Sequence, residues 1–433
     1  MCGYELSEFQ GTPASSLKSR YDAIVIGAEF AGLVAARDLS QKHNLNVLII
    51  EARDRIGGRT WTAKVLGEKV EMSGTWVHWE QPHLYGQLHR YGLHRDLKTS
   101  AGTYMPERQA FTPAAGKTEE LSMPGSGEVM ERVAQRALMP YPHDPLRDPA
   151  PWMRYDHLTV GDRLDALTDI PQWEKSLFES NVNTFGSAPG QQTGFVEALR
   201  WYALGGHSMG LMFEKAGMFK LGNGGVTSFA TAILDDYRGD RVFNTAVCEI
   251  NHSQSGVEVP TSSGRRFGAK AIVSTIPLNC LADIRFNPPL SPLRQAAIAQ
   301  GHINKGAKIN FKLRETLPGW FWTSSDSANS SFVFAFSDHN GTQPSGPSGT
   351  CCIGFGYNGR LTDKKNAKHI VSEFKENMNS NATVDAYATH DWMNDPYAKG
   401  AWACWDPNSA SNDGRIYWVS KPRSDWSRGW GGS

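Results

Sequence analysis

The sequence predicts an α/β fold with a second, mixed domain, and three observations support this prediction. An apolar run at 23–26 leads through a glycine-containing turn into residues with helical spacing, and a second apolar run follows at 47–50. Further strand-like runs recur at 241–250 and 271–277, and the latter is expected to be buried. Residues from about 98 to 218 instead show helical patches that proline and glycine interrupt.

The first turn has the layout of a dinucleotide-binding βαβ unit. Gly27 would make the tight turn, and Gly32 would let the helix pack on the strand. The second glycine position, where the backbone approaches a pyrophosphate, holds Glu29 beside Ala28. Glu51 ends the second strand about 20 residues beyond the turn, as expected for an acid that binds a ribose. Alone, this pattern also fits an ordinary buried strand and helix joined by glycine, although the dinucleotide-binding interpretation is favoured.

The segments that follow are more specific. Residues 51–60 include paired glycines and an arginine, which suit phosphate oxygens, and residues 70–78 include a Gly-Thr-Trp sequence. This arrangement resembles the flavin-containing amine oxidases, most closely the fungal monoamine oxidases, from about residue 19 to the end of the chain. The resemblance implies that FAD is bound by Gly27, Ala28, Glu29, Gly32, Glu51, Ala52, Arg53, Gly57, Gly58, Arg59, Gly74, Thr75, Trp76 and Val247.

The resemblance also implies a domain division. We expect a discontinuous Rossmann-like FAD-binding domain and an α+β substrate domain whose sheet is flanked by helices. The expected ranges are a flexible leader at 1–18, FAD-binding segments at 19–97, 219–288 and 396–433, and substrate-domain segments at 98–218 and 289–395. The helices expected within them are 172–182, 193–203, 226–237 and 366–378, with a surface loop at 341–350.

Three residues carry the chemistry that the resemblance implies. In the family a lysine matching Lys308 reaches the flavin N5 through a water and assists reoxidation. Trp402 and Trp430 match two facing aromatic walls that exclude water and orient the amine. Taken alone, a lysine in a strand is more often solvated, and Lys312 competes for the role. The alternative for the two tryptophans is that they are core or surface residues among the 14 of this chain, and the wall interpretation is favoured more for Trp402 than for Trp430. Ala401 replaces the cysteine to which animal relatives attach their flavin, so non-covalent FAD is expected.

Composition narrows the partners. The 433 residues carry 44 basic and 44 acidic side chains, so no nucleic-acid partner is indicated. No apolar run approaches the roughly 20 residues that span a bilayer, and no secretory segment precedes the first strand. A small-molecule amine and O2 are the expected partners, in the cytoplasm or the peroxisome, and a homo-oligomer is compatible with the sequence. Six cysteines lack metal or redox spacing and are expected to be reduced and mostly buried.

The histidines near the Gly-Thr-Trp segment do not predict a metal site. His78, His83, His89 and His94 lack a matching set of cysteines or carboxylates, so no metal is expected. His78 is interpreted either as a pocket residue or as a solvated or core histidine.

Two features depart from the family. Glu29 places negative charge where a pyrophosphate would lie. The chain ends at Ser433, before the family's helix that faces the pyrophosphate, so we expect the helix to be lacking and FAD binding to be weakened further.

The functional hypothesis is an FAD-dependent monoamine oxidase, an oxidoreductase that converts a primary amine to an aldehyde with release of ammonia and hydrogen peroxide. One alternative is an inactive or truncated relative that binds FAD poorly. Another is a polyamine or amino-acid oxidase on the same scaffold, although no Arg–Tyr clamp for a carboxylate is identifiable.

Overall fold

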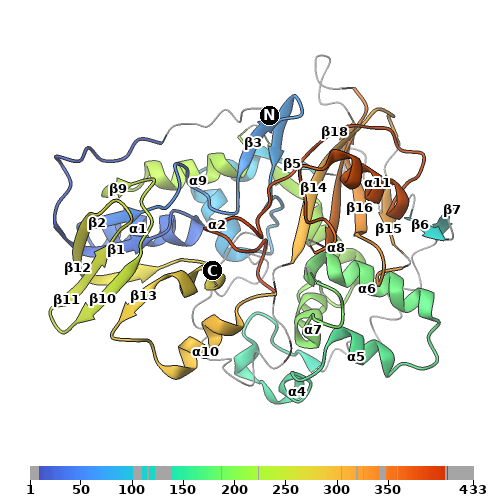
Figure 1. The fold of residues 1–433 in the computed structure, drawn as a ribbon, viewed down its shortest axis with the longest axis horizontal. Coiled ribbons are helices and arrows are strands. Elements are labelled where there is room, and N and C mark those ends of the chain that lie inside the picture. The colour runs from blue at the N-terminus through green and yellow to red at the C-terminus, as the bar shows by residue number, and fades with distance from the viewer. Residues whose placement is uncertain are drawn as a thin grey trace.

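The computed structural model contains two seven-stranded sheets with helices packed around them (Figure 1). It describes residues 9–100, 110–114, 117–121, 138–186, 188–222, 224–303, 305–317, 320–324, 326–340, 348–357, 359–404 and 407. Trp430 and most of the predicted surface loop at 341–350 lie outside these residues.

The first sheet contains the predicted βαβ unit. In spatial order its strands are β13 (Arg285–Asn287), β10 (Glu249–Ser253), β11 (Gly256–Pro260), β12 (Arg266–Ser274), β1 (Arg20–Ile26), β2 (Val47–Ile50) and β9 (Asp240–Val242). β1 pairs in parallel with both β12 and β2, which places the turn after β1 beside the carboxyl end of β2. Ligands of open α/β sheets bind at this end of the strands.

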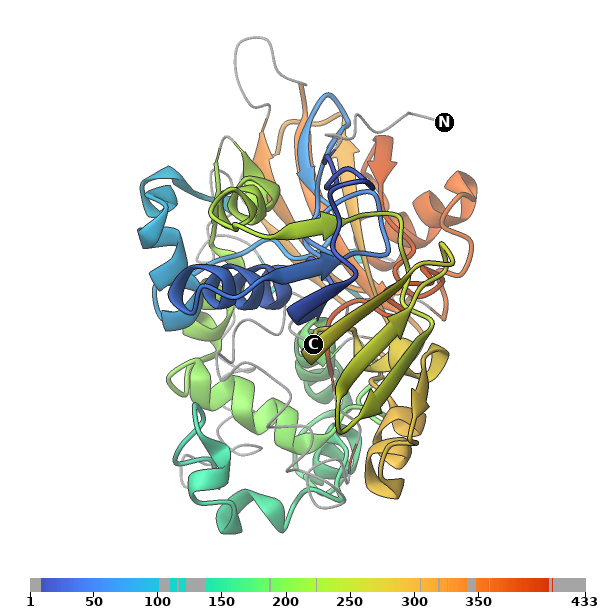
Figure 2. The same ribbon diagram turned by 90° about the vertical axis from the view of Figure 1, so that its left-hand side faces the viewer.

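Helices α1 (Phe30–Lys42) and α9 (Gly225–Asp235) cover one face of this sheet. Leu33 of α1 and Phe229 of α9 are buried with Val25 and Ile49 in one apolar cluster. Figure 2 shows the two helices beside β1. The turn that precedes α1 is therefore held by a packed core on one side.

The expected strand at 271–277 is less buried than predicted. β12 ends at Ser274, and Ala271 and Ser274 are exposed among the described residues. The residues at 271–274 pair with β1 on one side, whereas β11 pairs only with the earlier residues 266–269 of β12. The side chains of residues 271–274 are therefore only partly buried.

The second sheet is mainly antiparallel. In spatial order its strands are β18 (Val384–Ala388), β14 (Gly306–Leu313), β17 (Thr350–Tyr357), β16 (Phe332–Asn340), β15 (Phe321–Thr323), β6 (Ala110–Ala114) and β7 (Lys117–Leu121). Helix α11 (Ala367–Asn377) packs its Ile370 and Phe374 against one face. The prediction of this helix is confirmed, and Asn366 caps it by accepting the N–H of His369 at 3.1 Å.

The remaining helices form a third layer below the second sheet in Figure 1. They are α4 (Ala150–Met153), α5 (Val160–Asp165), α6 (Gln172–Gly186), α7 (Phe195–Leu204) and α8 (Met209–Gly217), with α10 (Pro292–Gln300) nearer the first sheet. The helices predicted at 172–182 and 193–203 are confirmed as α6 and α7. Their buried aromatic and aliphatic residues make a separate apolar cluster around Trp152 and Phe195.

Short elements connect the layers. They are the hairpin β3 (Thr62–Val65) and β4 (Glu68–Glu71), the pair β5 (Leu97–Thr99) and β8 (Phe219–Leu221), helix α2 (Pro82–Arg90), and the 3-10 helices η1 (Leu93–Asp96), η4 (Pro145–Arg147) and η5 (Leu278–Asp283).

The first described residues lie along an edge of the first sheet. In the stretch predicted as a leader, Thr12 donates its N–H to the carbonyl oxygen of Arg241 at 2.8 Å, and Phe9 packs on Phe243. The domain ranges proposed from the sequence remain a prediction.

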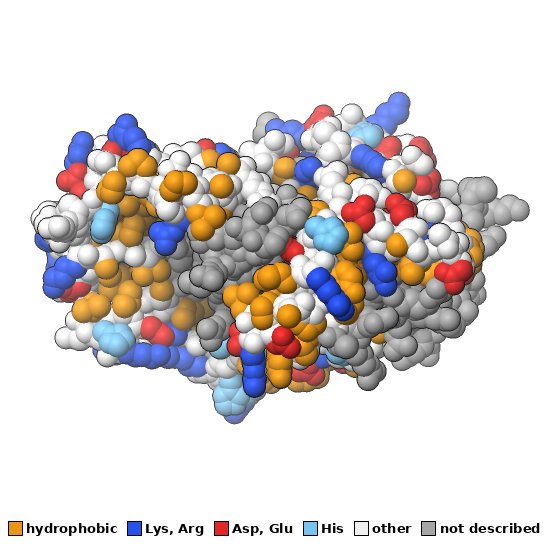
Figure 3. Space-filling model, turned by 90° about the horizontal axis from the view of Figure 1, so that it is seen from below, with side chains coloured by type: hydrophobic (Ala, Val, Ile, Leu, Met, Phe, Trp, Pro, Cys, Tyr) orange, Lys and Arg blue, Asp and Glu red, His pale blue; other side chains and the backbone are white. Residues whose placement is uncertain are grey.

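The described surface mixes both signs of charge. On the face viewed in Figure 3, basic and acidic side chains are interspersed with apolar ones. No helix within the described ranges combines the length and apolarity that crossing a membrane requires.

Candidate active site

The turn after β1 has the close packing that its glycines predict. Gly27 has a φ of +102°, which favours glycine. A Cβ on Gly32 would lie 2.0 Å from the carbonyl oxygen of Gly27, so α1 can approach the strand only because residue 32 lacks a side chain. The Thr275 hydroxyl donates to the carbonyl oxygen of Ile26 at 2.8 Å and fixes the neighbouring strand end.

Glu51 closes the same turn from β2. One of its carboxylate oxygens accepts the backbone N–H of Ala28 at 2.7 Å, and the other accepts that of Arg53 at 2.9 Å. Burial raises the pKa of Glu51, while these two hydrogen bonds oppose the rise. Each carboxylate oxygen can accept more than one hydrogen bond, so ribose hydroxyls are compatible with this geometry. Ala52 lies between Glu51 and Arg53 in the sequence.

Glu29 lies immediately before α1 and points toward the second glycine turn. Its carboxylate accepts the backbone N–H of Arg59 at 3.0 Å, and a Cβ on Gly58 would meet it at 2.7 Å. Gly57 and Gly58 both have positive φ, so this turn also depends on glycine. Burial raises the pKa of Glu29 to about 7, although the Arg59 charge opposes the rise.

Arg59 links this turn to the segment that precedes Trp402. Its guanidinium lies 3.8 Å from the Glu29 carboxylate and donates to the carbonyl oxygen of Ala401 at 3.1 Å. Arg53 makes a second link through a two-point ion pair with Asp395. Val247, predicted from the family to meet adenine, precedes β10 and forms an isolated bridge with Thr261, which follows β11.

These residues fit a dinucleotide at every point except one. The glycine turns, the buried Glu51 and the start of α1 form the cradle that a pyrophosphate and ribose need. Ionised Glu29 does not fit, because it would oppose an anionic phosphate and it already accepts the N–H of Arg59. FAD binding therefore requires that Glu29 rotate away or carry a proton.

Lys308 is buried in the middle of β14, with 3% of its surface exposed, whereas Lys312 is partly exposed. The Lys308 ammonium donates to the carbonyl oxygens of Glu71 at 3.0 Å and Ser73 at 2.9 Å, and to the hydroxyl of Thr75. Burial lowers its pKa, although the neighbouring Glu71 carboxylate opposes this. A buried amine held in this way can exchange its proton near neutral pH.

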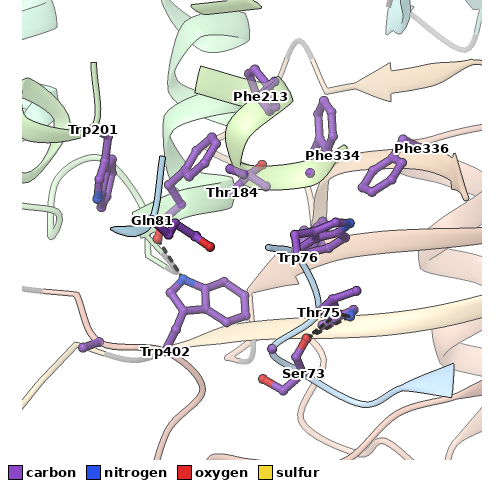
Figure 4. Close-up of a pocket in the computed structure, with 17 residues that line it drawn as sticks. Ser73, Thr75, Trp76, Gln81, Thr184, Trp201, Phe213, Phe334, Phe336 and Trp402 are labelled. Carbon is purple, nitrogen blue, oxygen red and sulfur yellow. Dashed lines mark hydrogen bonds between the residues drawn. The ribbon is translucent and has the colours of Figure 1, made fainter. Parts of the chain in front are cut away.

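Lys308 also lines an aromatic cavity of about 140 Å³ between the second sheet and the helical layer. Figure 4 shows the residues that surround this cavity. The Lys308 ammonium lies 4.8 Å from the ring centroid of Trp76. The aromatic residues that line the cavity are Trp76, Phe185, Trp201, Phe213, Phe334, Phe336, Phe355 and Trp402. The polar lining residues are Ser73, Thr75, Gln81, Thr184 and Lys308, with Gly74, Ala216, Gly217 and Ala403 between them.

Trp402 is fixed at this cavity. Its indole N–H donates to the carbonyl oxygen of Phe185 at 2.8 Å, and its ring meets that of Phe355 edge-on at 6.0 Å. In Figure 4, Trp402 and Trp76 are drawn near the Ser73–Thr75 segment, with Phe213 and Phe334 further along the cavity. The structure therefore brings Trp402, Trp76 and Lys308 together.

The rest of the aromatic lining was not predicted. Phe334 and Phe336 are two residues apart on β16, the spacing of one face of a strand, but that spacing is equally typical of a core strand. Phe185 and Phe213 come from helices whose orientation the sequence does not determine. His78 is buried against Trp79 and is not among the described residues that line the cavity.

Comparison with known proteins gives one family. The sequence profile described as "Flavin containing amine oxidoreductase" matches residues 30–424. Pseudooxynicotine dehydrogenase from Pseudomonas sp is 29% identical over 427 residues, which cover 95% of this chain and 83% of that protein. Amine oxidase [flavin-containing] B from Sus scrofa is 24% identical over 458 residues, covering 95% and 83%.

Solved structures agree on the fold. Wild-type putrescine oxidase bound to putrescine superposes with a TM-score of 0.76 at 19% identity, covering 91% of this chain and 90% of that one. Cyclohexylamine oxidase from Brevibacterium oxydans IH-35A gives a TM-score of 0.74 at 20% identity, covering 95% and 96%. The predicted fold class is confirmed.

Proposed function

Because this chain belongs to the family of flavin-containing amine oxidoreductases, we propose that it oxidises a primary amine with one amino group and an apolar body. The products would be an aldehyde, ammonia and hydrogen peroxide. The observation that carries this proposal is the aromatic cavity, because its described lining contains neither a carboxylate nor a guanidinium. The family's cofactor is FAD, which when bound takes a hydride equivalent from the amine and passes electrons to O2.

The aromatic lining supports binding of the neutral amine. Aromatic walls exclude water, and a desolvated site favours the uncharged form of an amine. Trp402 is held by Phe185, so its ring can limit how the substrate turns and present one C–H bond in a fixed direction. Trp430, the second expected wall, lies outside the described residues.

Lys308 supports a proton-handling role at this cavity. When charged, its Nζ has three oxygen acceptors, and when neutral it keeps two N–H donors and gains a lone pair. Burial favours the neutral form. We assign to Lys308 the holding and release of one proton next to the reacting groups.

The lining of the cavity also favours a monoamine over a diamine or an amino acid. A diamine would bring a second ammonium, and an amino acid would bring a carboxylate, and burial of either charge without a partner is unfavourable. Relatives named for pseudooxynicotine and putrescine show that the family includes several amine classes, so the choice here rests on the cavity.

The test compares hexylamine, its terminal diamine and the corresponding α-amino acid at equal concentrations. Peroxide, aldehyde and ammonia are measured on protein whose FAD content has been determined by its visible spectrum. We expect the monoamine to be oxidised fastest, by about tenfold or more, with ammonia released in equal amount to peroxide. Faster oxidation of the diamine or amino acid would assign the chain to another substrate class.

A second candidate is a family member that binds FAD poorly and is inactive. It is favoured by one observation, the Glu29 carboxylate that accepts the Arg59 N–H within the expected phosphate cradle. The visible spectrum of the purified chain, before and after acid precipitation, distinguishes the two. Flavin released into the supernatant supports a loaded enzyme with non-covalent FAD, and colourless protein supports the second candidate.

A further inference from the structure

Three potential metal ligands converge at one end of the second sheet. Glu68 begins β4, His339 lies near the end of β16, and Cys351 lies near the start of β17. The His339 Nε2 is 2.9 Å from a Glu68 carboxylate oxygen, and the Cys351 sulfur is 3.0 Å from the other. The three ligand atoms all lie within 4.8 Å of one another. Ligand atoms around a tetrahedral Zn²⁺ lie roughly 3 to 4 Å apart, so small side-chain shifts would let these three share one ion.

An irregularity in the strand pairing brings the ligands together. Ser337 pairs with Cys352 and His339 pairs with Cys351, so Asp338 is an additional residue in β16. Such a bulge changes the direction of neighbouring side chains and is common beside functional sites. It sets His339 opposite Cys351 and leaves Asp338 next to the histidine ring.

Asp338 orients the histidine as a second ligand shell does. One Asp338 carboxylate oxygen lies 2.7 Å from His339 Nδ1, which favours a proton on Nδ1 and leaves Nε2 to face Glu68. Asp338 is only 5% exposed, and its other oxygen has no hydrogen-bond partner among the described residues. A buried carboxylate oxygen without a hydrogen-bond partner is unfavourable, and a bound ligand or water would satisfy it. Lys220, the nearest cation, pairs with the oxygen that faces His339.

A polar cavity of about 540 Å³ opens beside the cluster. Glu68, Asp338, His339 and Cys351 all line it. Zinc sites with three protein ligands keep a fourth position for water, and this cavity supplies room for one. Asp338 lines the same cavity, and its buried, unpartnered oxygen lacks the hydrogen bond that a nearby water would donate after a small side-chain shift.

We propose that Glu68, His339 and Cys351 form a Zn²⁺ site, with Asp338 as the positioning residue of the histidine. One nitrogen, one sulfur and one oxygen donor are the ligands that Zn²⁺ accepts, whereas Mg²⁺ and Ca²⁺ prefer oxygen alone. A thiolate and a carboxylate together neutralise the ion. Binding replaces the thiol proton of Cys351 and any proton on His339 Nε2, and these protons pass to solvent. The argument for this zinc site does not rest on the proposed amine oxidation.

The chain contains a matched control for the thiolate. Cys352 is also buried, but as the next residue of β17 it packs in the apolar cluster of Phe311 and Phe374. Cys351→Ser removes a ligand, and Cys352→Ser makes the same chemical change one residue away. Glu68→Gln and Asp338→Asn test the oxygen ligand and the positioning residue.

The full-length protein, with its FAD content recorded, is dialysed against a chelator and titrated with zinc chloride, and bound zinc is counted by elemental analysis. We expect one tightly bound zinc per chain in the wild type and in Cys352→Ser. In Cys351→Ser and Asp338→Asn the affinity for zinc should be about 10 to 100-fold lower. Titration in two buffers of different protonation enthalpy should reveal release of the thiol proton in the wild type and in Cys352→Ser, and its loss in Cys351→Ser. Circular dichroism verifies that each variant is folded.

Cobalt provides a second measurement. Its main result comes from the wild type, so it remains informative even if a variant folds poorly. Co²⁺ in the chelator-treated wild type should give a thiolate-to-cobalt charge-transfer band and, beyond the flavin absorption, tetrahedral d–d bands. Both should be kept in Cys352→Ser and lost in Glu68→Gln or Cys351→Ser. Wild-type protein that binds no zinc and gives no thiolate band would overturn the proposal and leave an ion-pair cluster only.

Discussion

Glu29 accepts the backbone N–H of Arg59 at 3.0 Å and thereby joins the start of α1 to the second glycine turn. In a dinucleotide-binding cradle, helix N-termini and glycine turns supply their N–H groups to phosphate. The chain's own carboxylate takes one of these donors. FAD and Glu29 therefore compete for the same positive potential, and this competition has measurable consequences.

We expect Glu29→Gly to retain FAD more tightly than the wild type. The substitution removes a buried negative charge and returns an N–H donor to the cradle, so the dissociation constant for FAD should fall by about tenfold or more. Fluorescence titration of the apoprotein with FAD measures it. Glu258→Gln, an exposed charge change in the same sheet, is the control and should leave the constant unchanged. Equal affinities for Glu29→Gly and wild type would show that Glu29 moves aside freely.

Glu29 should also make the stability of the apoprotein depend on pH. Burial raises its pKa from 4.5 to about 7, so the folded state binds the proton more tightly than the unfolded state. Its contribution is present in full below the unfolded pKa and is lost as the pH rises through about 7. Compared with Glu29→Gln, the wild type should lose up to about 3 kcal/mol of unfolding free energy between about pH 4.5 and pH 8. Urea denaturation at several pH values measures the difference, and parallel curves for the two proteins would contradict the prediction.

Lys308→Met should lower kcat by about a hundredfold or more, if Lys308 exchanges a proton beside the reacting groups. Lys312→Met is the control, because Lys312 lies on the same strand but is partly exposed. Peroxide formation under saturating amine gives kcat, and anaerobic reduction followed by mixing with O2 separates the two half-reactions. A matching loss in Lys312→Met would point to a general effect on β14 instead.

Trp402→Ala should lower kcat/KM for an apolar amine by about 10 to 100-fold, because one wall of the cavity is removed. Trp402→Phe keeps an aromatic face but loses the hydrogen bond to Phe185, so it distinguishes ring contact from anchoring. The control is Trp173→Ala, since Trp173 is 52% exposed on α6. Steady-state kinetics with hexylamine measure all three. Unchanged kinetics in Trp402→Ala would remove this residue from the proposed site.

Much of the scaffold could be predicted because it depends on local patterns. The glycine turn at Gly27 and the alternation of apolar runs gave the βαβ unit, and helical spacing gave α6, α7 and α11. Boundaries were less accurate: α6 continues to Gly186, four residues beyond the predicted end. The expectation of mostly buried cysteines is confirmed for those in the described ranges, where Cys248 alone is exposed.

The contacts of the site could not be predicted in the same way. The sequence singled out Lys308 and Trp402 by resemblance, but not that Lys308 would donate to Glu71, Ser73 and Thr75. Those partners are more than 200 residues away along the chain. The sequence also gave no sign that Cys351 would meet Glu68, because no metal-ligand spacing connects them.

The sequence by itself determined the α/β fold class and the positions where glycine is needed, because both follow from short-range pattern and backbone sterics. The family followed from the resemblance that the ordered motifs carry. Only the tertiary structure decided where the Glu29 carboxylate points, which rings enclose the cavity, and that Glu68, His339 and Cys351 meet. Side-chain direction, burial and the resulting pKa shifts depend on neighbours from distant segments, and the packing of two sheets and a helical layer selects those neighbours.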